Sequence, residues 1–346
     1  MRGELTANGS ILNRRQGKKI LKRRNRNQLN IDKGLLEVLY FGAVTLLCVI
    51  SLLRGCAARS AEVATASVET GTENSGGGVA SGPDSTSPEG APSDPFYSNA
   101  RGVRDYTGTN ASVRKNTFDP ARFGYVSDTS ENITYYDDNF VALQGIDVSE
   151  HQGDIDWKKV AEAGYEFVFV RLGFRGYGEE GTLNEDTRAI EYLRGAENAG
   201  MQVGAYFFSQ AVTEEEAEEE AEFAVGILER SGVKLDLPLV YDPEFIPGVN
   251  GRANHVTREQ VCLNTDEFRD TAEAAIHCKV ALYANLYWEN NMFDAETLNE
   301  YEIWYADYLD APETPYHFTW WQYSETGTVP GIKGAMDLNL WIRRMD

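Results

Sequence analysis

Residues 239–245 read Leu239-Val-Tyr-Asp-Pro-Glu-Phe245, an apolar run that ends abruptly in two acids separated by one proline. Alternate residues of a strand point the same way, so Asp242 and Glu244 are expected to project together, roughly 6–7 Å apart at Cα. Pro243 has no N–H to donate, which suits the end of a strand and not its middle. The stretch therefore predicts a strand that ends in a pair of carboxyl groups.

A similar pattern repeats on both sides of this stretch, because short apolar runs alternate with helix-like segments from residue 141 to residue 346. The expected strands are 144–148, 167–172, 203–208, 237–241, 280–284, 302–306, 319–324 and 338–343, and the expected helices are 156–163, 186–199, 213–232 and 257–276. Helix-like segments are weak or absent after residue 306. The alternation therefore predicts an α/β fold, an irregular (β/α) barrel and not a symmetric one.

Acids and aromatic residues gather where these strands are expected to end, which is where barrels of this kind place their chemistry. Asp147 ends the first expected strand, and Asp337 lies where the last one begins. The other polar and aromatic residues at these ends are Tyr206, Tyr283, Trp304, Trp321 and Gln322. Since the faces of sugar rings are apolar and stack on aromatic rings, we expect these residues to bind a sugar. The alternative is that the aromatic rings only pack the barrel.

Two neighbouring carboxyls in a partly dry cleft repel each other, so the pKa of one is expected to rise. One protonated acid beside one charged acid suits the cleavage of an acetal. The alternative is that Asp242 and Glu244 only cap the segment that follows. The four histidines lack zinc-ligand spacing, and no phosphate loop or dinucleotide fingerprint occurs, so we expect neither metal nor cofactor. Cys262 and Cys278 are expected to be free and buried, since about 24 Å of helix separates them.

The N-terminal third predicts a membrane anchor. Residues 1–34 hold ten Lys and Arg in a chain of net charge −22, and residues 35–53 are almost entirely apolar. About 20 such residues span a bilayer as a helix, and basic residues before a span stay in the cytoplasm. We therefore expect a cytoplasmic segment 1–34, a transmembrane helix 35–53 and an extracellular remainder of a single-pass protein in the cell membrane. A buried core helix and lipid attachment at Cys56 are the alternatives.

Residues 57 to about 115 are rich in Ser, Gly, Thr, Ala and Pro, which predicts disorder, and residues 116–140 show no clear period. We therefore assign residues 54–140 to a flexible extracellular linker, a disordered tether, and residues 141–346 to the folded domain. The acidic main body argues against nucleic acid as a partner, because phosphate binding needs a basic surface. No feature of the sequence indicates an oligomeric state.

Six motifs in order resemble the family 25 glycoside hydrolases, which are lysozymes (N-acetylmuramidases). These motifs are Gly145-Ile-Asp-Val-Ser-Glu-His-Gln-Gly153, Asp156-Trp157, Gly204-Ala-Tyr-Phe207, Asp242-Pro-Glu244, Trp321-Gln-Tyr-Ser324 and Asp337-Leu-Asn339. The resemblance covers about residues 141–346. It implies a flattened, irregular (β/α) barrel with a long groove, and hydrolysis of the β-1,4 bond between N-acetylmuramic acid and N-acetylglucosamine in peptidoglycan.

The resemblance also implies roles for the four acids. Glu244 matches the general acid, Asp242 the acid that assists the 2-acetamido group or stabilises charge, and Asp147 and Asp337 the flanking acids. Pro243 departs from the family, which more often has an apolar or aromatic residue there. Attack by the acetamido oxygen and direct attack by water both remain open, although two close acids favour the acetamido route.

Two functions without catalysis compete with this hypothesis: a catalytically silent module that binds peptidoglycan glycan strands, and a structural wall tether. The presence of all four expected acids counts against the first, and the lack of a wall-binding repeat counts against the second. Because an acidic domain is repelled by anionic wall polymers, a membrane anchor supplies the localisation instead. We therefore expect local remodelling of the cell wall and not wholesale lysis.

Overall fold

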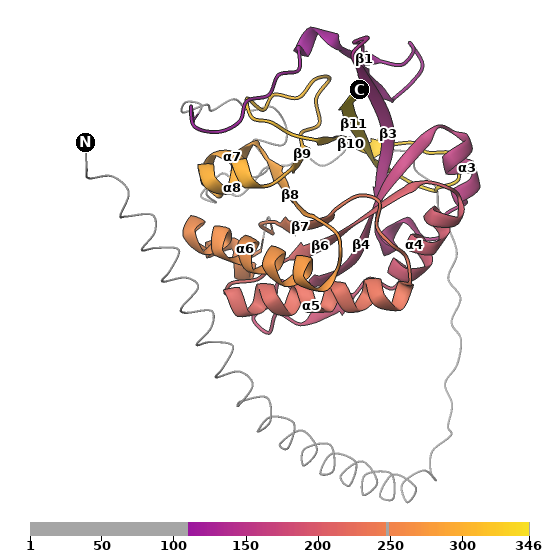
Figure 1. The fold of residues 1–346 in the computed structure, drawn as a ribbon. Helices are drawn as coiled ribbons and strands as arrows, with labels where there is room; N and C mark the ends of the chain where they lie inside the picture. The colour runs from indigo at the N-terminus through magenta and orange to yellow at the C-terminus, as the bar shows by residue number, and fades with distance from the viewer. Residues whose placement is uncertain (1–109, 247–248, 346) are drawn as a thin grey trace, which may run out of the picture. The chain divides into compact units, whose positions relative to one another are not determined.

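The structure is a computed structural model that describes residues 110–246 and 249–345 (Figure 1). The predicted cytoplasmic segment, the predicted span 35–53 and the linker up to residue 109 lie outside these residues. Within the described ranges, every helix is too short or too polar to cross a membrane.

A nine-stranded sheet closes on itself to form the barrel, because its first strand, β3, also pairs with β4. The ring runs β3, β11, β10, β9, β8, β7, β6, β4, and β5 flanks β4 outside it. The bounds are β3 Phe140–Val148, β4 Tyr165–Arg175, β5 Leu183–Glu185, β6 Gln202–Ser209, β7 Leu239–Pro243, β8 Val280–Asn285, β9 Ile303–Ala306, β10 Trp320–Gly327 and β11 Met336–Arg344. The α/β barrel predicted from the alternation of strands and helices is confirmed.

The last strand gives the barrel its irregularity. β11 runs antiparallel to both of its neighbours, β10 and β3, whereas the other strand pairs of the ring are parallel. Only residues 328–335 connect β10 to β11, too few for the crossover that a parallel pair needs. As a result β11 begins at the end of the barrel where β3 finishes, and Asp337 pairs with Asp147.

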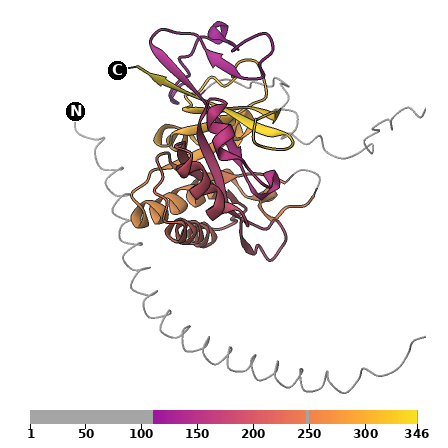
Figure 2. The same ribbon diagram turned by 90° about the vertical axis from the view of Figure 1, so that its right-hand side faces the viewer.

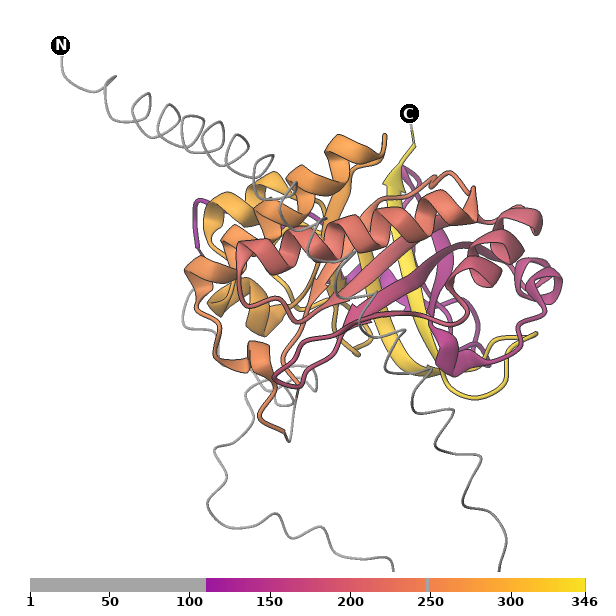
Figure 3. The same ribbon diagram turned by 90° about the horizontal axis from the view of Figure 1, so that it is seen from below.

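Helices cover the outer faces of the early strands. Their bounds are α3 Trp157–Glu162, α4 Ala189–Asn198, α5 Glu214–Ser231, α6 Arg258–Ala275, α7 Leu286–Asn291 and α8 Ala295–Glu300. α5 and α6 lie side by side across the strands (Figure 3). Thr213 caps α5 by accepting from the Glu216 N–H, and Gly232 ends it in the left-handed region at φ 70°, so the helix has the bounds expected from the sequence. The short helices α7 and α8 were not expected.

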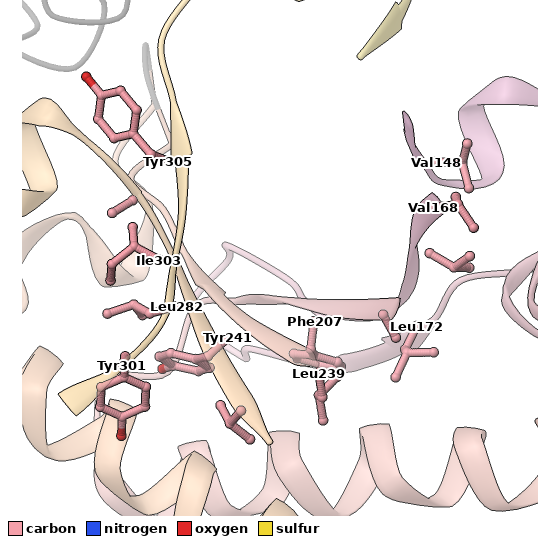
Figure 4. Packing of buried hydrophobic residues seen from close by; sticks show 14 of the residues in the cluster. Val148, Val168, Leu172, Phe207, Leu239, Tyr241, Leu282, Tyr301, Ile303 and Tyr305 are labelled. Atoms are coloured by element: carbon pink, nitrogen blue, oxygen red, sulfur yellow. The ribbon is translucent and has the colours of Figure 1, made fainter. Parts of the chain in front are cut away.

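Strand residues alternate between two apolar clusters. Inside the barrel, Phe169 stacks on Trp304 with ring centroids 4.8 Å apart, and Trp320 packs against the edge of Phe169. Outside, residues such as Phe207 and Tyr241 fill the space between strands and helices (Figure 4). The inward-facing rows lead up to the carboxyl ends of the parallel strands, where the acids lie.

Residues 110–140 cover the part of the barrel that has no helices (Figure 2). They include β1 (Phe123–Tyr125) and β2 (Ile133–Tyr135), which pair antiparallel. Phe123 packs edge-on against Trp321 at 5.3 Å, and Phe118 lies 5.2 Å from Phe318. We expected these residues in the linker, but their apolar side chains are needed to bury the outer face of β10. The folded part therefore extends at least to residue 110, upstream of the expected boundary at 141.

Candidate active site

Four carboxyl groups meet at the carboxyl ends of the parallel strands. Asp147 lies near the end of β3, Asp242 near the end of β7 and Glu244 just beyond it, while Asp337 lies near the start of β11. Asp147 and Asp242 are 4% exposed, and Glu244 and Asp337 are half-buried. Two of the four act on the others through their charge: Asp147 raises the pKa of Asp242, Glu244 and Asp337, and Glu244 raises that of Asp242 and Asp337.

Asp147 is held by two side-chain amides of fixed orientation. Its Oδ2 accepts from Gln322 Nε2 at 2.9 Å and from Asn339 Nδ2 at 2.7 Å. The Asn339 oxygen accepts from the indole N–H of Trp304 at 2.7 Å, and the Gln322 oxygen accepts from the hydroxyl of Tyr283 at 3.2 Å. Because an indole N–H only donates, the Asn339 amide must turn its NH₂ group toward Asp147.

Burial and these bonds act on Asp147 in opposite directions. Desolvation is the larger effect and raises its pKa, while the bonds from Gln322 and Asn339 lower it. With two N–H donors on one oxygen, Asp147 is the member of the four that is best stabilised as a carboxylate.

The pKa values of Asp242 and Glu244 are both raised, although the sequence suggested a rise in only one of them. Desolvation is the first cause for each. The charges of Glu244 and Asp147 raise the pKa of Asp242 well above its usual range, and the charge of Asp147 adds to the rise at Glu244, to about 7. The hydroxyl of Tyr283 works against this rise at Glu244. Burial in the barrel mouth, more than mutual repulsion, therefore keeps Glu244 protonated near neutral pH.

Asp337 completes the group from the antiparallel strand. Burial is again the main cause of its raised pKa, and the charges of Asp147, Glu325 and Glu244 add to it. At neutral pH the site can therefore hold protons on several carboxyls beside one charged one, an arrangement that serves proton transfer.

Of the five residues predicted to bind sugar, three lie beside the acids, one lies beneath them and one points away from them. Tyr206 and Tyr283 lie next to the acids, since the charges of Asp147 and Asp242 raise the pKa of both hydroxyls after burial. Gln322 contacts Asp147 directly. Trp304 lies beneath them: it is 1% exposed, with the ring of Tyr206 at 5.7 Å. It supports the site but presents no face to a ligand.

The prediction for Trp321 is wrong. Its ring points out of the barrel, is fully buried in the outer cluster, and donates its N–H to Asp307 Oδ1 at 2.6 Å. Neighbouring residues of a strand face opposite sides, so Gln322 and Trp321 cannot both point into the site. The end of a strand can be recognised in the sequence more easily than the direction of each side chain.

Three residues of the site were not assigned a role from the sequence. Asn339 follows Asp337 by two positions and so shares its face, which is a signal the sequence contained. The hydroxyl of Tyr308 donates to Gln322 Oε1 at 3.1 Å from a loop that has no periodic pattern. Arg171 lies on β4, bonds Asp186 at 2.8 Å, and its charge lowers the pKa of Asp242.

Among residues 110–246 and 249–345, His, Cys, Asp and Glu side chains form no group of three suited to a metal ion. Cys262 and Cys278 are both free thiols; Cys262 is buried as expected, whereas Cys278 is only half-buried.

Comparison with known proteins agrees with this geometry. Residues 146–332 match the family described as glycosyl hydrolases family 25. The chain is 28% identical over 199 residues to the autolytic lysozyme of Clostridium acetobutylicum, which covers 57% of this chain and 55% of that protein. It is 31% identical over 204 residues to lysozyme M1 of Streptomyces globisporus, covering 57% and 67%. The chain thus spans little more than half of the clostridial protein.

A solved structure shares the fold. The modular autolysin LytC of Streptococcus pneumoniae, in complex with a synthetic peptidoglycan ligand, superposes with a TM-score of 0.52. The match covers 66% of this chain and 58% of LytC at 24% identity.

Proposed function

Since the chain belongs to glycosyl hydrolase family 25, we propose that it is a muramidase. It hydrolyses the β-1,4 bond between N-acetylmuramic acid and N-acetylglucosamine in the glycan strands of peptidoglycan. The observation that carries the proposal is the convergence of Asp147, Asp242, Glu244 and Asp337 at one end of the barrel, with raised pKa values for all four.

Glu244 is the general acid. Cleavage of a glycosidic bond needs a carboxyl group that is still protonated when the substrate binds. Burial and the negative charge of Asp147 hold the pKa of Glu244 at about 7, so this condition is met up to neutral pH. Glu244 is half-buried at the end of β7, so its carboxyl can approach a sugar in the barrel mouth.

Asp242 orients the 2-acetamido group of the substrate. Its Oδ1 is buried and accepts no hydrogen bond from the described residues. A buried acceptor without a donor is unfavourable, and the N–H of an acetamido group would satisfy it. In this role Asp242 places the acetamido oxygen for attack on the anomeric carbon. Asp147, with Asp337 beside it, supplies negative charge near the oxocarbenium-like centre.

The anchored topology explains where this activity is used. A basic segment 1–34 and an apolar span 35–53 hold the chain in the cell membrane with residues 54–346 outside, next to the wall. An enzyme tethered in this way acts on the glycan within reach of its anchor. Its role is then local remodelling of the cell wall.

The test is mass spectrometry of the reducing ends that the full-length chain releases from purified peptidoglycan. New ends on N-acetylmuramic acid are the expected result. Ends on N-acetylglucosamine would assign a different bond and overturn the proposal. Binding without any released ends would instead identify a silent glycan-binding module.

A further inference from the structure

Glu244 lies beyond the hydrogen-bond ladders that hold its strand. β8 pairs with β7 only as far as Tyr241, and β6 pairs with it only as far as Pro243. A proton donor must nevertheless be held close to its productive position, within about 0.5 Å. Contacts from outside the sheet therefore have to fix the backbone at Glu244.

Gln210 supplies such a contact from the loop after β6. Its Nε2 donates to the backbone oxygen of Glu244 at 2.5 Å and to that of Ser209 at 3.0 Å. The side chain is fully buried. It thus joins the end of β6 to the first residue beyond β7.

Gln210 is itself fixed by two charged residues. Its backbone N–H donates to Glu220 Oε1 at 3.3 Å, and its backbone oxygen accepts from Arg252 Nη1 at 3.1 Å. Arg175 donates to Glu220 at 2.9 Å, while Arg252 makes two bonds to Glu216, at 2.6 and 2.9 Å. Both ion pairs involve α5, so Gln210 is attached to a long helix and cannot move independently of it.

Stability alone does not account for this arrangement. Gln210 Oε1 is buried and accepts no hydrogen bond from the described residues, which is unfavourable for folding. An apolar side chain of the same length would avoid that loss. A buried polar group that lowers stability in this way is expected at a functional site, where the function of the site requires it.

We propose that Gln210 is a positioning residue, which holds the backbone at Glu244 so that its carboxyl is presented to the substrate. The proposal rests on the proposed function, because it assigns Gln210 a part in the same reaction. It is not a catalytic residue, since the backbone oxygen of Glu244 lies between it and the reacting group.

The experiment replaces Gln210 in the full-length chain with methionine, which has similar length but no N–H, or with asparagine, which is one methylene shorter. We expect kcat on peptidoglycan to fall on the order of 10²-fold, the effect of misplacing a reacting group by about 1 Å. KM should change little, and the melting temperature should fall only slightly, as in the control described below. A second measurement is the pKa of the Glu244 carboxyl by ¹³C NMR, with the signal assigned by its loss in Glu244→Gln.

In both variants this pKa should fall from its raised value toward that of an ordinary glutamate, because a released Glu244 gains water. Asp147, whose charge raises the pKa of Glu244, and Tyr283, whose hydroxyl lowers it, remain unchanged in these variants. Thr265→Val is the matched control: it removes another buried side-chain bond, from Thr265 Oγ1 to the Val261 oxygen at 2.8 Å, which involves neither Gln210 nor Glu244. It should lower the melting temperature slightly and leave kcat and the Glu244 pKa unchanged.

Gln210→Met and Gln210→Asn chains with wild-type kcat and an unchanged Glu244 pKa would overturn the proposal. The proposal would also be overturned, in favour of a structural role, if Thr265→Val lost as much kcat as the Gln210 variants for the same fall in melting temperature. If the wild-type chain releases no reducing ends, the proposed function fails, and the Glu244 pKa still decides whether Gln210 controls that residue.

Discussion

Glu244 owes its suitability as a proton donor to its surroundings and not to its residue type. An exposed glutamate is almost fully ionised at pH 7. At the barrel mouth, loss of water and the charge of Asp147 stabilise its protonated form. In water the same side chain would already have lost its proton at pH 7 and could not donate it to the substrate.

The first prediction concerns the proton of Glu244. Glu244→Gln keeps the shape of the side chain but has no acidic proton, so the release of reducing ends should fall ~10²–10⁴-fold. The melting temperature should stay the same or rise, because one of four mutually repelling acids is gone. An enzyme that keeps near wild-type activity after this change would contradict the assignment of Glu244.

The second prediction concerns pH. Activity requires protonated Glu244, whose pKa is raised to about 7. Activity should therefore be present at mildly acidic pH and be lost as the pH rises through about 7. The profile is best measured as kcat/KM on soluble glycan fragments at constant ionic strength, so that the charge of the wall does not contribute. If activity is instead already lost as the pH rises to 5, Glu244 titrates as an ordinary carboxyl.

At the scale of elements, residues 110–140 take the place of the missing helices. Phe118 contacts four other rings, at centroid distances from 5.2 to 6.3 Å. The sequence did not reveal this, because residues 116–140 have neither a helical nor a strand period. Its position is determined by the outer faces of β10 and β11, and the sequence did not show what packs against these faces.

The third prediction tests this contribution. Phe118→Ala should lower the free energy of unfolding by about 2–3 kcal/mol, less than a fully buried Phe because the ring is half-buried. Thermal or denaturant unfolding measures the change. Val126→Ala, on an exposed residue of the same segment, is the matched control and should stay within about 0.5 kcal/mol. Equal and small effects would mean that the segment adds nothing to the fold.

The fourth prediction concerns Glu289 of α7, which is buried outside the active site. Burial raises its pKa to about 8, the charge of Asp307 adds to this, and the bond from Thr314 at 2.6 Å opposes it. The folded chain thus holds a proton that the unfolded chain releases at lower pH. The contribution of Glu289 to stability is complete below its unfolded pKa and is lost as the pH rises toward about 8.

Glu289→Gln imitates the protonated side chain and should remove this loss. Its melting temperature should equal that of wild type near pH 4 and exceed it at pH 8. The expected difference is about 2–4 °C for each kcal/mol by which the free energy of unfolding of the variant exceeds that of wild type. A difference that does not grow with pH would show that Glu289 is not protonated in the folded chain.

At the scale of the molecule, the sequence predicted the strands, the long helices and the four acids, because strand ends carry a local signal. It did not predict which way each side chain points at those ends, as Trp321 shows. It also did not indicate that Tyr308 and Arg171 belong to the site, or that residues 110–140 pack against the barrel. These depend on contacts between distant parts of the chain, such as the bond between Tyr308 and Gln322.

The fifth prediction concerns topology and is based on residues 1–53, which lie outside the described part of the chain. With basic residues before an apolar span, the barrel should be outside the cell. Protease added to intact protoplasts should therefore degrade residues 110–346, as detected by an antibody against the barrel. A cytoplasmic protein probed in the same sample should remain whole. Survival of the barrel would place it inside.

The antiparallel direction of β11 determines where another domain can be fused to this chain. Arg344 at its end pairs with Phe140 at the start of β3, and Met345 donates to the Asn139 oxygen. The polypeptide leaves the barrel at the rim opposite the four carboxyls. Arg114, near the other described end, also contacts that rim through the Tyr301 oxygen just before β9. A reporter or cargo domain fused behind the last residue should therefore leave the entrance for glycan unobstructed.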